Sequence, residues 1–73
     1  MSDAREEAAR KLDVASAQLE RASSHCRVAA RHFRNGEVPR GAAHAWAAFG
    51  HLTVAEEHLR DQARQHSENA QLD

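Results

Sequence analysis

The sequence predicts an all-α fold, an antiparallel hairpin of two long helices that dimerises into a four-helix bundle. Alanine, the strongest helix former, supplies 16 of the 73 residues. Apolar residues recur at heptad spacing on both sides of a single turn-forming stretch, and no alternating β pattern is present. Because a chain of 73 residues holds one small domain, residues 1–73 are expected to form a single helical-hairpin domain.

The first helix is expected over residues 3–34. Asp3 followed three residues later by Glu6 has the spacing of a capping box, with Asp in place of the usual Ser or Thr. Asn-Gly at 35–36 is typical of a helix C-terminus whose glycine adopts the left-handed conformation. The turn is therefore expected at 35–38.

The second helix is expected over residues 39–66, because Pro39 suits the first turn of a helix. Residues 67–73 lose the apolar periodicity and are expected to form a frayed tail. A short link between two arms of similar length forces the helices to run antiparallel, as in an αα-hairpin.

Heptad columns define the face along which the two helices are expected to pack. In the first helix two adjacent columns form a continuous seam, whose members are Leu12, Leu19, Cys26 and Phe33, and Ala8, Ala15, Ala22 and Ala29. In the second helix the corresponding column is Ala45, Leu52 and Leu59, with Phe49 and further alanines beside it. The seam predicts a hydrophobic core that contains Leu19, Phe33 and Leu52.

A single hairpin of this size buries too little apolar surface to be stable alone, so a homodimer is expected. An aromatic residue beside a glycine on a second flank of the later helix offers a surface for further helices. The candidate interface residues are Trp46, Phe49, Gly50 and Thr53. The alternative is that Trp46 covers the core of its own hairpin. The function favoured by this pattern is a non-enzymatic helical interaction or regulatory module that self-associates or binds a protein partner.

Five of the six histidines follow heptad spacing beside the core columns, namely His25, His32, His44, His51 and His58. In a hairpin folded about residue 38, cross-helix neighbours have numbers that sum to about 76, which pairs His32 with His44 and His25 with His51. These pairs are expected at two levels about 10 Å apart. Imidazole and thiolate bind Zn, Cu and Ni, so a metal-binding helical protein is the first alternative, with His25, Cys26, His32, His44 and His51 as candidate ligands. Otherwise the histidines are a polar rim beside an alanine-rich core.

Charge is distributed unevenly along the hairpin. Residues 21–40 contain five arginines and the single acid Glu37, whereas residues 56–73 contain five acids and two arginines. An acidic partner or a phosphate backbone would dock at the basic tip, where the candidate anion-binding residues are Arg27, Arg31, Arg34 and Arg40. Nucleic-acid binding is not favoured, because no aromatic residues are interleaved for base stacking. The competing interpretation is a solvated face with cations near a helix C-terminus.

No pattern in the sequence supports a catalytic centre, so an enzyme is not expected. Ser24, His25 and Cys26 are consecutive on a helix and cannot face one another. The stretches 27–32 and 60–66 resemble the Arg-x(4–6)-His motif of HEPN ribonucleases, a family of helical dimeric enzymes. That resemblance implies an RNA-cleaving activity as the last alternative.

The remaining features narrow the setting in which the chain acts. A formal net charge of −1 predicts no strong attraction to nucleic acid or anionic lipid. No apolar run approaches the ~20 residues that span a bilayer, so no membrane association is expected. The charged opening does not match a signal peptide, and a lone cysteine excludes an intramolecular disulfide. A cytoplasmic protein is therefore expected.

Overall fold

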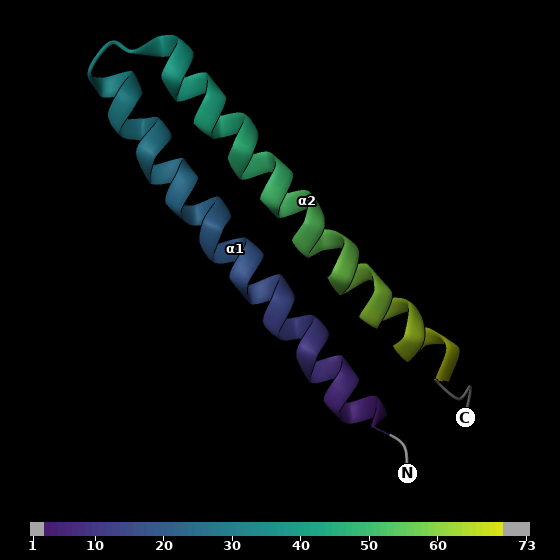
Figure 1. Ribbon diagram of the computed structural model, residues 1–73. Coiled ribbons are helices and arrows are strands. Elements are labelled where there is room, and N and C mark those ends of the chain that lie inside the picture. The colour runs from purple at the N-terminus through teal and green to yellow at the C-terminus, as the bar shows by residue number, and fades with distance from the viewer. Residues whose placement is uncertain (1–2, 70–73) are drawn as a thin grey trace.

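The computed structural model describes residues 3–69, which form two helices joined by a tight turn (Figure 1). Helix α1 spans Ala4–Arg34 and helix α2 spans Val38–Asn69. The two helices lie side by side and antiparallel, so the start of α1 and the end of α2 meet at the same end of the hairpin. The predicted all-helical hairpin is confirmed.

The helix bounds differ from the prediction mainly at the end of α2. This helix begins one residue before the predicted start and continues to Asn69, so residues 67–69 are helical rather than part of a frayed tail. Extending an existing helix fixes one residue for each new hydrogen bond, so it needs no apolar periodicity. The rest of the predicted tail, residues 70–73, lies outside the described residues.

The turn is closed by backbone hydrogen bonds at the end of α1. Gly36 has a φ of +75°, the left-handed conformation that glycine adopts without a steric penalty. Its N–H donates to the Phe33 carbonyl at 3.0 Å, and the Glu37 N–H donates to the His32 carbonyl at 2.8 Å. These two bonds form a Schellman motif and confirm the prediction for Gly36.

The predicted capping box at the start of α1 is not formed. The Asp3 side chain makes no capping hydrogen bond. Instead the Asp3 carbonyl accepts a hydrogen bond from the Glu7 N–H at 2.7 Å, which is an ordinary helical backbone bond. The first turn therefore depends on its backbone rather than on a side-chain cap.

The helices pack through a column of small residues, which we call the alanine column. Its members are buried and spaced by seven residues in each helix, namely Ala15, Ala22 and Ala29 of α1 and Gly41, Ala48 and Ala55 of α2. Small side chains allow two helix backbones to approach closely. At Gly41 an added Cβ would lie 2.7 Å from the ring of Phe33, so the ring occupies the space that glycine leaves.

The large members of the predicted seam lie outside this core, which corrects the sequence prediction. Leu19, Phe33 and Leu52 are 41%, 48% and 45% exposed. Leu19 follows the buried Ala15 by four residues, which turns it about 40° around α1 and places it at the edge of the helix contact. A hairpin of two helices has no third element to cover that edge.

The hairpin is a single layer of helices. Its Cα radius of gyration is 16.9 Å, and its extents are 56, 25 and 14 Å. A compact domain of this length has a radius of gyration of about 11 Å. Domains normally bury their core between two packed layers, so a one-layer hairpin leaves both broad faces uncovered.

Replacing Ala55 with leucine should destabilise the hairpin, because Ala55 is 0% exposed and leaves no room for a larger side chain. We expect the free energy of unfolding to fall by about 1–3 kcal/mol, measured from urea unfolding at fixed protein concentration. Ala43→Leu is the matched control, since Ala43 is exposed on the same helix. A control variant as unstable as Ala55→Leu would contradict the assignment of the alanine column.

Candidate functional site

Two different faces flank the alanine column. Residues three positions after each buried small residue, mostly histidines, lie along one side of the helix contact. Residues four positions after it, mostly large and apolar, lie along the other side. Neighbouring residues of a helix are separated by about 100°. The two sets therefore lie on opposite sides of the alanine column and form separate candidate sites.

The histidines of the two helices interleave into one continuous stack. Ring centroids are 5.3 Å apart for His32 and His44, 5.2 Å for His44 and His25, and 5.4 Å for His25 and His51. The angles between successive ring planes are 14°, 30° and 13°, so all three contacts are stacked. Each of the two central rings therefore lies between two imidazoles of the other helix.

Hydrogen bonds fix both ends and the centre of the stack. His51 Nδ1 lies 2.6 Å from Gln18 Oε1, and His32 Nδ1 lies 3.1 Å from Glu37 Oε1. At the centre the two Nδ1 atoms of His25 and His44 are 2.9 Å apart. We call this series the imidazole zipper, whose members are Gln18, His51, His25, His44, His32 and Glu37.

These contacts determine where the protons of the zipper lie. The Gln18 carbonyl oxygen and the Glu37 carboxylate can only accept, so His51 and His32 each donate from Nδ1. The contact between His25 and His44 needs one Nδ1 that donates and one that accepts. This contact is therefore directional, with one imidazole as the donor and the other as the acceptor.

The sequence predicted the histidine pairs but not how they are joined. His32 contacts His44 and His25 contacts His51, as expected. The two levels are not separate, however, because the His25–His44 contact joins them. The terminal partners differ from the prediction: the sum of 76 pairs Gln18 with His58, whereas Gln18 Oε1 contacts His51, and the contact of Glu37 with His32 was missed. Each of the two residues lies seven positions before a zipper histidine in its own helix or turn. That heptad position was the available signal.

The candidate metal ligands do not form one site. Cys26 lies on the other side of the alanine column, where it lines a shallow hollow with Ala45, Phe49 and Leu52. The zipper nitrogens of His25 and His44 face one another at hydrogen-bond distance. Across the described part of the chain, no three His, Cys, Asp or Glu side chains are placed to hold an ion together. Instead of converging on one point, four of the histidines contact one another across the two helices.

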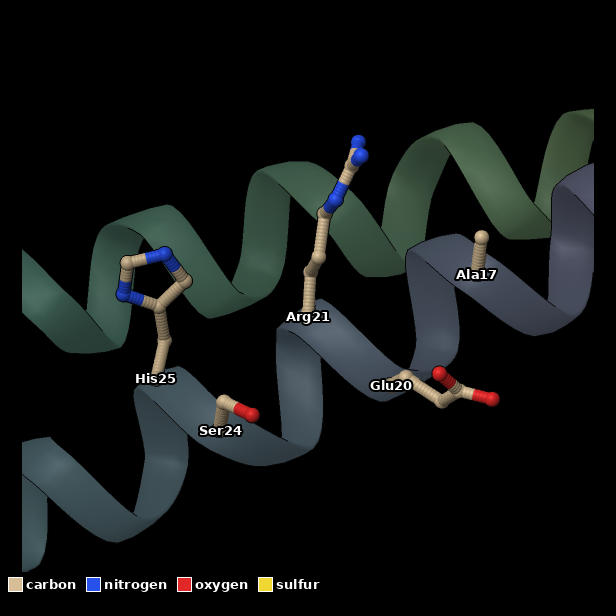
Figure 2. A pocket seen from close by; sticks show the side chains of 5 residues that line it. All are labelled: Ala17, Glu20, Arg21, Ser24 and His25. Atoms are coloured by element: carbon tan, nitrogen blue, oxygen red, sulfur yellow. The ribbon is translucent and has the colours of Figure 1, made fainter.

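A polar hollow beside the zipper belongs to α1 alone. It is shallow and open, and it is lined by Ala17, Glu20, Arg21, Ser24 and His25 (Figure 2). Figure 2 shows Arg21 and His25 extending toward α2, whereas Glu20 lies on the outer side of α1. All five residues come from adjacent turns of one helix, so their side chains do not converge on a ligand.

The basic residues at the tip do not converge either. The Arg27 guanidinium donates to the hydroxyls of Ser23 and Ser24 at 2.8 and 3.2 Å, and Arg40 pairs with Glu37 at 3.2 Å. Arg31 and Arg34 are exposed. The four candidate anion-binding residues therefore share a region of surface but not a single binding point.

The residues of the HEPN-like motif are also not brought together. Arg27 is exposed and bonded to serines of its own helix, whereas His32 is part of the imidazole zipper. Five residues along a helix correspond to about 140° of rotation, so these two side chains leave α1 in different directions. In the second stretch Arg60 pairs with Glu56 at 2.6 Å, and His66 is exposed.

The second candidate site is the apolar face, whose residues are Leu12, Leu19, Cys26 and Phe33 of α1 and Trp46, Phe49, Leu52 and Leu59 of α2. Trp46 and Phe49 are 72% and 58% exposed, and their rings lie 6.1 Å apart in a tilted arrangement. Two shallow hollows adjoin at Ala45 and Phe49, one extending to Phe33 and the other to Cys26. Together they form a shallow apolar groove between the helices.

The predicted interface residues divide between this face and the opposite side of α2. Trp46 and Phe49 belong to the apolar face, and the Thr53 hydroxyl beside them donates to the Phe49 carbonyl at 3.0 Å. Gly50 follows the buried Ala48 by two residues, which turns it about 200° around the helix, away from α1. A Cβ added at Gly50 would meet nothing within 4 Å.

Comparison with known proteins gives no relative from which to transfer a function. No family model matches the sequence, and neither a curated protein nor a solved structure gives a match. Within residues 3–69, neither helix has the length and apolarity needed to cross a membrane. The function is therefore argued from the two faces of the hairpin.

The hydrogen bonds of the zipper predict the tautomer of a particular histidine. In the neutral form of its ring, His51 should carry its proton on Nδ1 because Gln18 Oε1 accepts it. Long-range ¹H–¹⁵N NMR distinguishes the two ring nitrogens, and the exposed His66 provides the reference. Gln18→Leu should remove this preference. A wild-type His51 with its proton on Nε2 would show that this end of the zipper is not formed.

Proposed function

We propose that this chain is a non-enzymatic, self-associating interaction module, in which two copies pack their apolar faces together as a four-helix bundle. One observation carries the proposal. Within residues 3–69, the buried hydrophobic core consists only of alanines, while the large side chains of the apolar face are all at least 41% exposed. The hairpin thus holds its two helices together with small residues and presents its large apolar residues outward.

The energetics favour covering this face. Complete burial of a Leu, Phe or Met side chain stabilises a protein by about 1.5–3 kcal/mol. In a single hairpin these side chains contribute only part of that amount, because about half of each remains in contact with water. A contiguous exposed surface made of large apolar side chains is typical of a protein interaction site.

The surface area of the hairpin also exceeds that of a compact monomer. Its accessible surface is 5820 Å², whereas a compact protein of the same mass exposes about 4,500 Å². The excess of about 1,300 Å² is larger than the ~800 Å² that each partner buries in a standard interface. A second copy would supply the missing layer and cover the groove at Phe49.

A second copy suits this face because both partners then present the same apolar surface, with the same shape and chemistry. Each hairpin presents two parallel ridges of large residues, one from each helix, and two such surfaces interdigitate in a four-helix bundle. We place the module in the cytoplasm, since the exposed thiol of Cys26 in the centre of the face stays reduced there.

Self-association predicts a particle of twice the chain mass of 8.1 kDa at micromolar concentration, measured by sedimentation equilibrium. Leu19→Lys should shift the protein toward monomer, because it places a charge in the centre of the buried interface. Val14→Lys is the matched control. Val14 and Leu19 are 43% and 41% exposed on the same helix, but they differ by about 140° in direction.

Trp46 gives an independent readout of the same association. It is the only tryptophan, and its ring is 72% exposed in the single hairpin. Its fluorescence emission should therefore move to shorter wavelength as protein concentration rises and the face becomes covered. A chain that sediments as a monomer at 100 µM with concentration-independent emission would overturn the proposal.

A further inference from the structure

Two hairpins that meet face to face about a two-fold axis have only two arrangements. With the axis parallel to the helices, both turns lie at the same end, and α1 lies opposite α2 of the second copy. With the axis across the helices, the turns lie at opposite ends, and α1 lies opposite α1 of the second copy. This inference rests on the proposed self-association and concerns which arrangement forms.

The charge distribution distinguishes the two arrangements. Residues 21–50, the half of the hairpin that contains the turn, carry five arginines and one glutamate. The rest of the chain carries ten acids and five bases. Turns at the same end would place the basic halves together and the acidic halves together. Turns at opposite ends would place each basic half beside an acidic half.

We propose that two copies associate with their turns at opposite ends, so that α1 packs antiparallel against α1 of the second copy. A single column on the outer side of α1 carries the inference. At seven-residue spacing it reads Glu6, Asp13, Glu20, Arg27 and Arg34. The column changes sign between Glu20 and Arg27. A two-fold axis at that point places Glu20 beside the second copy's Arg27, and Asp13 beside the second copy's Arg34.

The helix surface next to this charge column allows a close approach. Ala9, Ser16, Ser23 and Ala30 follow each other at seven-residue spacing. The charge column lies four residues after them, about 40° around the helix. Leu19 and Cys26 lie on the other edge, three residues after Ser16 and Ser23. The alanine column is built in the same way, with larger side chains three and four residues after each small one. Beside that column the histidines of α1 contact those of α2.

The centre found on α1 agrees with the centre of the apolar face on α2. Zipper contacts alternate between residue-number sums of 76, as for His25 with His51, and 69, as for Gln18 with His51, so residues whose numbers sum to about 72 lie level in the hairpin. The ion pair of Lys11 with Asp61, at 3.6 Å, has this sum. A centre at 23–24 in α1 is therefore level with 48–49 in α2. Phe49, which is 58% exposed, lies at that level, so the same axis brings the Phe49 rings of the two copies together.

Charge reversal at the two central positions tests this arrangement. Glu20→Arg alone and Arg27→Glu alone each place like charges opposite one another twice per dimer, and each should weaken self-association about tenfold. An equimolar mixture of the two variants restores opposite charges in both pairs. The mixture should form a heterodimer with the wild-type affinity, measured by sedimentation and by Trp46 emission.

Arg21→Glu is the matched control, because it makes the same charge change in the same part of α1 but about 120° away. It should weaken self-association less than Arg27→Glu does. Circular dichroism of each variant establishes that the helices are intact. A wild-type dimer whose single variants associate normally, or whose mixture forms no heterodimer, would overturn the antiparallel arrangement alone. A monomeric wild type would overturn the proposed self-association and this inference with it.

Discussion

The structure depends on the close packing of small residues along the alanine column. Because Ala55 and its neighbours bring the two backbones close together, larger side chains cannot enter the space between the helices. They are displaced to the edges of the contact, imidazoles on one side and Leu, Phe and Trp on the other. The zipper and the apolar face are therefore both consequences of the same packing, and a wider separation between the helices would remove them.

The two faces have different physical roles. In the zipper, directional contacts alternate between the helices from Gln18 to Glu37, so a shift of one helix by a heptad would leave an end of the stack without its partner. The zipper therefore specifies the alignment of α1 with α2. The apolar face has little such directionality within one chain, and its large side chains gain most when a second surface removes them from water. One side of the hairpin therefore aligns its two helices, and the opposite side favours association with a second copy.

Much of this architecture could be predicted from the sequence, because it depends on local signals. Alanine content, the Asn-Gly pair and Pro39 were sufficient for both helices and the turn, and heptad spacing was sufficient for the His25–His51 and His32–His44 contacts. Residues 67–69 were misassigned because helix propagation does not require apolar periodicity. The core was only partly predicted, since a heptad pattern identifies two adjacent columns but not which one faces the partner helix. Leu19 and Ala22 both fit the heptad spacing, so spacing alone does not distinguish them. Which of their two columns is buried depends on how closely the two helix backbones pack.

The most direct measurement of the central claim is an isotope-filtered NOE experiment on a mixture of ¹³C-labelled and unlabelled protein, which detects contacts between copies only. The alanine column is internal to one hairpin, so the Ala55 methyl should show no contact with the other copy. The Leu19 and Leu52 methyls should show contacts with protons of the other copy, among them the Phe49 ring. Contacts between copies at Ala55, or their absence at Leu19 and Leu52, would contradict the assignment of small residues to the hairpin core and large residues to the interface.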